Sequence, residues 1–193
     1  MRRKTRNFNL GNIGIGSDSP ISVQSMTKTD TRDVDKTVNQ INELELAGCD
    51  IIRCAVPNID AAMALKQIIK KTNIPVVADI HFEYTLALEA IKSGIHGLRI
   101  NPGNIGQRKR IVTVVNAAKD AGIPIRIGVN SGSLEKDILQ KHGSPTPDAL
   151  VESAERHLGI LDELNFTNVK VSVKSANVNI MKESYRKLAK ITD

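Results

Sequence analysis

Aromatic residues and cysteines are scarce in this chain of 193 residues. It contains no Trp, three Phe and two Tyr, which leaves little aromatic surface for stacking nucleic acid bases. We therefore expect no nucleic acid partner. The two cysteines, Cys49 and Cys54, are too few and too awkwardly spaced for a disulfide framework or a metal knuckle. We expect them to pack in the core of a protein from a reduced cytoplasm, without a bound metal.

Long hydrophobic runs are also missing. No apolar stretch approaches the roughly 20 residues of a membrane span, and the opening MRRKTRNFNL lacks the apolar core of a signal peptide. These absences predict a cytoplasmic protein without a membrane partner. The 27 Lys and Arg residues outnumber the 21 Asp and Glu residues, giving a net charge of +6. This excess favours an anionic partner, and we interpret it as a phosphorylated small molecule.

Short runs rich in Val and Ile alternate along the chain with segments that have apolar residues at helical spacing. The runs predict strands at 21–27, 50–56, 75–81, 97–103, 124–130 and 168–174. The segments between and after them predict helices at 33–48, 58–72, 83–94, 108–122, 147–165 and 177–193. Three helices end on a glycine, Gly48, Gly94 and Gly122, as a C-terminal cap requires.

Strict alternation of strand and helix predicts a parallel sheet covered by helices, which either stays open and doubly wound or closes into a barrel. Polar residues at or near the ends of successive strands decide between these closures, because a barrel brings all its strand ends to one site. They are Gln24, Ser25, Arg53, Asp79, His81, Arg99, Asn101, Arg126, Asn130 and Lys174. We predict an α/β fold, a TIM (β/α)8-type barrel truncated to about six βα units.

Residues 1–193 are then one partial barrel domain. The Gly-Asn turn within RNFNLGNIGIGSDSP predicts a short N-terminal β-hairpin that closes the barrel floor. Residues 131–146 form a long connection, typical of a lid, a binding loop or a short extra helix. The remaining histidines, His96, His142 and His157, are interpreted as surface residues.

Arg53, Arg99 and Arg126 occur at equivalent places on three predicted strands. Each arginine alone is explained by an ion pair at the barrel rim. Three arginines around one cavity would repel one another unless an anion were bound between them. The planar hydrogen-bond donors of a guanidinium match the geometry of phosphate oxygens. We therefore favour an anion site at these arginines.

Asp79 and His81 lie two residues apart, on the same face of one predicted strand. Such a pair is compatible with a metal site, with acid and base catalysis or with a purely structural contact. The spacing alone leaves these alternatives open.

Several motifs together resemble a known enzyme family. VQSMTKTDT, VADIHFEY, LRINPGNIG, PIRIGVNSGSLEKDIL and VKVSVKSANV are similar in order and spacing to the 4-hydroxy-3-methylbut-2-enyl diphosphate synthases, the IspG or GcpE family of bacterial-type isoprenoid biosynthesis by the methylerythritol phosphate pathway. The resemblance covers essentially the whole chain. It implies a barrel that binds 2-C-methyl-D-erythritol 2,4-cyclodiphosphate, followed by a smaller domain carrying a [4Fe-4S] cluster.

The resemblance also implies roles for individual residues. Arg53, Arg99, Arg126 and Lys174 would contact the diphosphate, with Asn101 and Asn130 beside them. Asp79 and His81 would act as catalytic residues near the hydroxyl groups of the substrate. The reaction it implies is reductive ring opening with loss of water, driven by reduced flavodoxin or ferredoxin in a homodimeric full-length enzyme.

The chain departs from the family pattern in one respect. The cluster ligands, three cysteines and a glutamate, lie downstream of anything present, and Cys49 and Cys54 match none of them. Three hypotheses stay open: the chain is a piece of the reductive oxidoreductase and inactive alone, it is a non-catalytic diphosphate-binding protein, or it is another phosphate-handling barrel enzyme such as a pterin synthase relative.

Overall fold

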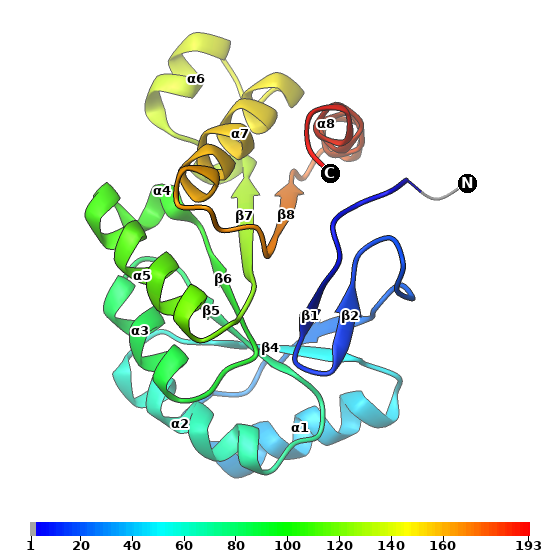
Figure 1. The fold of residues 1–193 in the computed structure, drawn as a ribbon, viewed down its shortest axis with the longest axis vertical. Coiled ribbons are helices and arrows are strands. Elements are labelled where there is room, and N and C mark those ends of the chain that lie inside the picture. The colour runs from blue at the N-terminus through cyan, green and yellow to red at the C-terminus, as the bar shows by residue number, and fades with distance from the viewer. Residues whose placement is uncertain (1–2) are drawn as a thin grey trace.

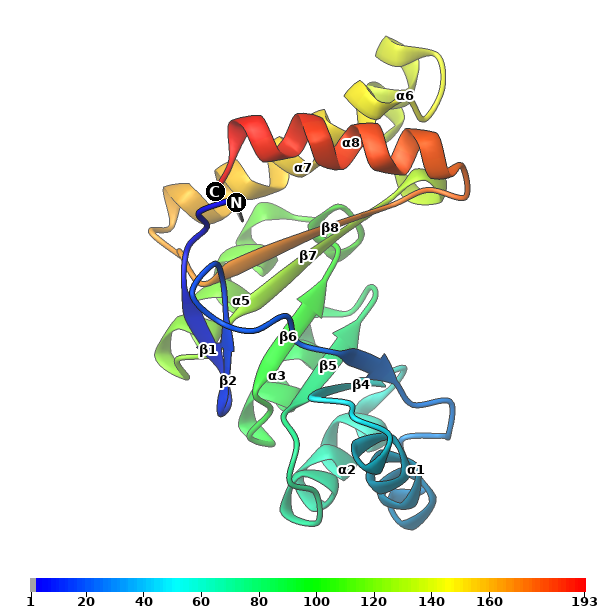
Figure 2. The same cartoon turned by 90° about the vertical axis from the view of Figure 1, so that its right-hand side faces the viewer.

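The computed structural model describes residues 3–193, and it shows a curled parallel sheet with helices on its outer side. Figures 1 and 2 show a small antiparallel hairpin on the concave side of this sheet. The hairpin strands are β1 (Phe8–Leu10) and β2 (Ile13–Ile15). The sheet consists of six strands in the order β3-β4-β5-β6-β7-β8. This arrangement confirms the predicted barrel type, its truncation to six units and its N-terminal hairpin.

Each predicted strand forms, although several are shorter than the apolar run that predicted them. The bounds are β3 Gln24–Met26, β4 Ile51–Ala55, β5 Val76–Ile80, β6 Gly97–Ile100, β7 Ile125–Asn130 and β8 Val169–Lys174. All neighbours in the sheet pair in parallel. Each crossover therefore carries at least one helix, because a parallel neighbour cannot be reached by a tight turn.

Six long helices occupy the predicted positions. They are α1 (Val34–Leu46), α2 (Ile59–Lys70), α3 (Tyr84–Lys92), α5 (Arg108–Asp120), α7 (Pro147–Glu163) and α8 (Val178–Ile191). The connection at 131–146 contains a 3-10 turn, Ser131–Ser133, and the short helix α6 (Lys136–His142). A further turn of helix, α4 (Pro102–Ile105), follows β6 where the sequence predicted only a break. No helix within residues 3–193 has both the length and the apolar character needed to cross a membrane.

Local capping explains where the helices start and stop. Asp33, Asn58 and Thr146 accept hydrogen bonds from backbone amides in the first turns of α1, α2 and α7, which satisfies donors that have no partner within the helix. Gly48 and Gly122, with φ of 91° and 66°, follow the ends of α1 and α5 in a conformation that a side chain disfavours. Gly94 does the same after α3, so the predicted caps are confirmed.

The two faces of the sheet differ in chemistry. Alternate strand residues, such as Ile52, Leu98 and Ile127, are fully buried in the main hydrophobic core against the helices. Because successive side chains point to opposite faces, the residues between them point into the barrel. The apolar core between the sheet and the helices thus stabilises the strands, and the barrel interior on the other face of the sheet can accommodate polar side chains.

The hairpin closes the lower end of this interior. Leu10, which is 1% exposed, packs with Ile51 and Val77 near the starts of β4 and β5. Gly97 makes room for it, since a Cβ there would lie 3.2 Å from the Leu10 Cδ1 atom. The structure therefore agrees with the expectation that the hairpin plugs the barrel floor.

We expect Leu10→Ala to lower the free energy of unfolding by about 2 to 5 kcal/mol, because it removes the buried plug and leaves a cavity. Chemical denaturation followed by circular dichroism measures this change. Ile21→Ala is the matched control, since Ile21 is 83% exposed and its loss should cost less than about 0.5 kcal/mol. Equal stabilities for the two variants would contradict the assigned role of the hairpin.

Candidate functional site

Charged and polar side chains fill the middle of the barrel interior. They come from alternate positions on neighbouring strands, which the strand register brings to similar heights. In the strand register, Asp79 on β5 lies next to Arg99 on β6, and Arg99 lies next to Arg126 on β7. Arg126 in turn pairs with Lys170 on β8. Barrel interiors are usually filled with bulky apolar residues, so this layer of charged residues is the candidate functional site.

Asp79 is the centre of the charged layer. Its carboxylate is 3% exposed and lies 2.9 Å from Nη1 of Arg99 and 3.3 Å from Nε of Arg53. Nε2 of His81 lies 3.5 Å from the same carboxylate. Among the inward positions of the six strands as described, Asp79 is the one carboxylate. The predicted pair Asp79 and His81 therefore does meet, and two of the three predicted arginines join it.

Arg126 lies beside Arg99 on the next strand and has neutral hydrogen-bond partners. Its Nε donates to Oγ of Ser172 at 3.0 Å, and its Nη1 donates to Oε1 of Gln24 at 3.4 Å. Burial lowers the pKa of Arg126, and repulsion from Arg53 and Arg99 adds to the effect. Arg126 is the second residue of β7; the prediction that it lies near the end of the strand is wrong, because β7 extends to Asn130. Its long side chain still brings it to the same interior.

A cavity of about 730 Å³ lies beside these residues, between the strands β3 and β8 at the two edges of the sheet. Arg53, Arg126 and Lys170 line it together with neutral polar groups such as Gln24 and Ser172. A cavity of this size accommodates a small ligand. Its cations make an anion the best match.

Lys170 is a site residue that the sequence reasoning missed. It is the second residue of β8 and points to the same side as Lys174. Burial, and then repulsion from Arg126, lowers the pKa of Lys170 to about 8. Its ammonium group has no hydrogen-bond or ion-pair partner within residues 3–193. The alternation in VKVSVK was the available signal, since it places Lys170, Ser172 and Lys174 on one face.

The remaining predicted residues lie at the upper rim. Asn101 is buried just after β6, and its Nδ2 donates to Oγ of Ser133 at 3.4 Å. Asn130 ends β7 and its Oδ1 accepts from the Gly132 amide at 3.1 Å. Lys174 is exposed and pairs in register with Asn130. The connection after β7 is thus built onto the rim, with Ser133 linking it to β6.

A pair formed by Glu135 and the buried His157 holds this connection to α7. Nε2 of His157 lies 3.1 Å from Oε1 of Glu135, and Oγ of Ser153 donates to Oε2 at 2.8 Å. Burial alone would raise the pKa of Glu135, but these hydrogen bonds lower it to about 2. The interpretation of His157 as a surface residue is wrong, since it is 4% exposed. Its place on the apolar face of α7 was the signal.

The two other histidines are also less exposed than expected. Nδ1 of His96 accepts a hydrogen bond from the Val76 amide at 3.1 Å, and burial lowers the pKa of His96. His142, at the end of α6, lies 2.7 Å from the carboxylate of Glu152. Both therefore have structural partners outside the charged layer.

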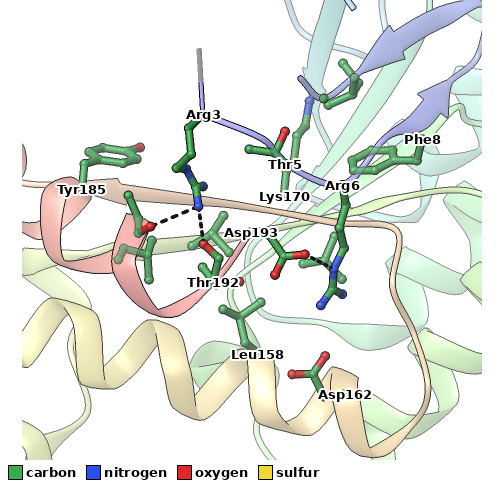
Figure 3. Close-up of a pocket in the computed structure, with 16 residues that line it drawn as sticks. Arg3, Thr5, Arg6, Phe8, Leu158, Asp162, Lys170, Tyr185, Thr192 and Asp193 are labelled. Atoms are coloured by element: carbon green, nitrogen blue, oxygen red, sulfur yellow. Dashed lines mark hydrogen bonds and ion pairs between the residues drawn. The ribbon is translucent and has the colours of Figure 1, made fainter. Parts of the chain in front are cut away.

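A second hollow, of about 460 Å³, lies between the N-terminal segment and α8 (Figure 3). Arg3 donates there to the carbonyl oxygens of Ala189 and Thr192, and Arg6 pairs with Asp193 at 3.1 Å. Its arginines are thus engaged by the end of α8 and the residues after it. We therefore place the candidate site in the charged layer and not in this hollow.

The described residues offer no ligand set for an iron–sulfur cluster. Within residues 3–193, no group of three or more His, Cys, Asp or Glu side chains is arranged to hold a metal. Cys49 and Cys54 are both buried. Burial raises the pKa of Cys54 to about 11, whereas cluster ligands are thiolates. The prediction that these cysteines pack in the core is confirmed.

Comparison with known proteins assigns this barrel to a family. Residues 5–193 match the model of the GcpE TIM-barrel domain. The chain belongs to the GcpE family. It is 60% identical over 96% of its length to a 4-hydroxy-3-methylbut-2-en-1-yl diphosphate synthase (flavodoxin) of Clostridium perfringens. It is 57% identical over 98% of its length to the protein of that name from Clostridium acetobutylicum.

The match covers 53% and 54% of these two relatives, so the chain spans about half the length of the curated relatives it matches. Solved structures with this fold include a Yersinia pestis dihydropteroate synthase, with a TM-score of 0.60 and 11% identity over 96% of this chain and 70% of that one. A phosphoenolpyruvate phosphomutase of Streptomyces platensis gives a TM-score of 0.57 and 13% identity over 89% and 66%. At these identities the likeness concerns the fold alone.

We expect the stability contributed by Lys170 to depend on pH. The pKa of Lys170 is about 8 in the folded chain, against an ordinary value of 10.5 that applies to the unfolded chain. Between these two pH values the unfolded state therefore binds more protons than the folded state. The free energy of unfolding should therefore rise with pH across this window, by roughly 1 to 2 kcal/mol.

Lys170→Met should lack this rise and should be more stable than the parent near pH 7. Denaturation at a series of pH values measures both effects. Lys174→Met is the control, because the exposed Lys174 on the same face should leave the rise in place. A rise that persists in Lys170→Met would contradict the assignment.

Proposed function

We propose that the chain is the substrate-binding barrel portion of a 4-hydroxy-3-methylbut-2-en-1-yl diphosphate synthase of isoprenoid biosynthesis. The substrate is 2-C-methyl-D-erythritol 2,4-cyclodiphosphate. Membership in the GcpE family supports the reaction class. The observation that carries the proposal is the charged layer, in which Arg53 and Arg99 share Asp79 while Arg126, beside Arg99 on the next strand, has neutral hydrogen-bond partners.

The diphosphate binds to the cations of the interior. Arg53, Arg99 and Arg126 offer planar donor groups that match phosphate oxygens. Lys174 contributes from the rim and Lys170 from within the cavity. Four of these groups are at least partly buried, so an anion would relieve their mutual repulsion as well as form hydrogen bonds.

The rim residues orient the rest of the substrate. Asn101 and Asn130 lie next to the Ser131–Ser133 turn, where amide groups can hold hydroxyl or phosphate oxygens. Asp79 fixes the direction of two arginines, and His81 is the more exposed of the proposed catalytic pair. His81 is therefore the group suited to move a proton to a departing hydroxyl.

The reaction consumes a pair of electrons and two protons. A carbon–oxygen bond to the cyclic diphosphate breaks, the neighbouring hydroxyl leaves as water, and a double bond forms between the two carbons. Reduced flavodoxin or ferredoxin would supply the electrons. Flavodoxin appears in the names of the relatives.

The iron–sulfur cluster of the family does not fit the residues of this chain, because both cysteines are buried and residues 3–193 hold no group of metal-binding side chains. We propose that the remaining barrel units and the iron–sulfur domain belong to the rest of a longer, homodimeric protein in the cytoplasm. The chain alone would then bind the diphosphate without reducing it. A pterin synthase role has weaker support, because the likeness to dihydropteroate synthase is at 11% identity.

We expect Arg53→Ala, Arg99→Ala and Arg126→Ala, made in the full-length protein, each to weaken binding of the cyclodiphosphate by about 10- to 100-fold. Charge-assisted hydrogen bonds are worth roughly 1.5 to 3 kcal/mol, and about 1.4 kcal/mol is a factor of ten. Arg→Lys should recover part of the loss, because an ammonium keeps the charge but not the planar fork. Calorimetric titration measures the affinities.

Arg156→Ala is the matched control, since Arg156 pairs with Asp137 on the outer surface and its loss should leave the affinity unchanged. Arginines that serve only as rim ion pairs would give a different pattern. They would change stability by about 0 to 1 kcal/mol and affinity not at all. Wild-type affinity in all three interior variants would overturn the proposed function.

A further inference from the structure

Gly128 has an unusual position for a glycine. It is buried in the middle of β7, on the inward face between Arg126 and Asn130. Glycine weakens a strand interior, because it lacks a side chain to pack and loses more entropy on ordering. A specific local reason for this glycine is therefore expected.

Backbone conformation does not supply the reason. Gly48, Gly106 and Gly122 have positive φ, and a Cβ added to any of them would meet nothing within 4 Å. Gly128 is the opposite case. Its φ lies outside the left-handed region, so an alanine could adopt the same backbone.

The space above Gly128 is occupied by the guanidinium of Arg99. A Cβ at Gly128 would lie 2.8 Å from both Nε and Nη2 of Arg99 and 3.2 Å from its Cζ. The guanidinium thus rests directly on the backbone of the neighbouring strand. Its Nη1 is held by Asp79 at 2.9 Å, while Nε and Nη2 donate to no group within residues 3–193.

We propose that Gly128 is a positioning residue for Arg99. By lacking a side chain, it lets the guanidinium lie flat on β7 with one nitrogen on Asp79 and the other two available to the anion. The inference rests on the proposed function, because it concerns how Arg99 is presented to the diphosphate. The role is steric and acts on binding through Arg99.

Gly128→Ala in the full-length protein should therefore displace the guanidinium and weaken binding of the cyclodiphosphate by about tenfold, since small misplacements of a positioning group have large effects. The fold should tolerate the change, because the group in the way is the end of a flexible side chain. Gly159→Ala is the control: Gly159 lies in α7, and its Cβ would meet nothing within 4 Å. It should leave the affinity unchanged.

A double-mutant cycle separates this role from a general structural one. In the Arg99→Ala background the guanidinium is absent, so adding Gly128→Ala should cause no further loss of affinity. If Gly128→Ala alone fails to fold, the double variant should regain the melting temperature of Arg99→Ala. Titration calorimetry and melting curves on the four proteins give both readouts.

The outcomes are distinct. A tenfold loss for Gly128→Ala that vanishes in the Arg99→Ala background supports the inference. Unchanged affinity in Gly128→Ala, additive losses, or a double variant that stays unfolded would overturn it while the arginine site stands. Unchanged affinity in Arg99→Ala itself would overturn both the inference and the proposed function.

Discussion

The ion pairs of Asp79 with Arg99 and Arg53 are the interaction on which the rest of the interior depends. One buried carboxylate holds two guanidinium groups, while Arg126 and Lys170 lie nearby with neutral partners or none among the described residues. Charges removed from water are costly unless they are compensated. The interior therefore carries more positive charge than it neutralises, which is the condition that makes an anion a stabilising ligand.

The rest of the fold creates room for this charge. Helices cover the outer face of the sheet with an apolar core, and the hairpin closes the floor by inserting Leu10 over Gly97. Gly128 opens a second gap, one strand away, which Arg99 fills. Two inward glycines on adjacent strands thus leave space for side chains: Gly97 for Leu10 of the hairpin, and Gly128 for the guanidinium of Arg99. The charged layer therefore lies between the hairpin, which closes the lower end of the barrel, and the carboxyl ends of the strands.

Much of this was predictable from local patterns. The strands, the six long helices and the glycine caps follow from periodicity and turn chemistry, which act over a few residues. Contacts between distant residues were not predictable in this way. The pairing of His157 with Glu135 joins α7 to the connection after β7, and the role of Gly128 depends on Arg99 from the adjacent strand. Lys170 was not predicted, because it lies at the second position of β8 and not at the end of the strand.

Proton uptake on binding tests the central claim, that the interior holds uncompensated cations for an anion, most directly. Burial lowers the pKa of Lys170 to about 8 in the free protein, and a nearby anion should raise this pKa. Calorimetric titration of the cyclodiphosphate into the full-length protein near pH 8, in two buffers of different ionisation enthalpy, should give a net proton uptake that Lys170→Met abolishes. Binding with the same enthalpy in both buffers would contradict the account.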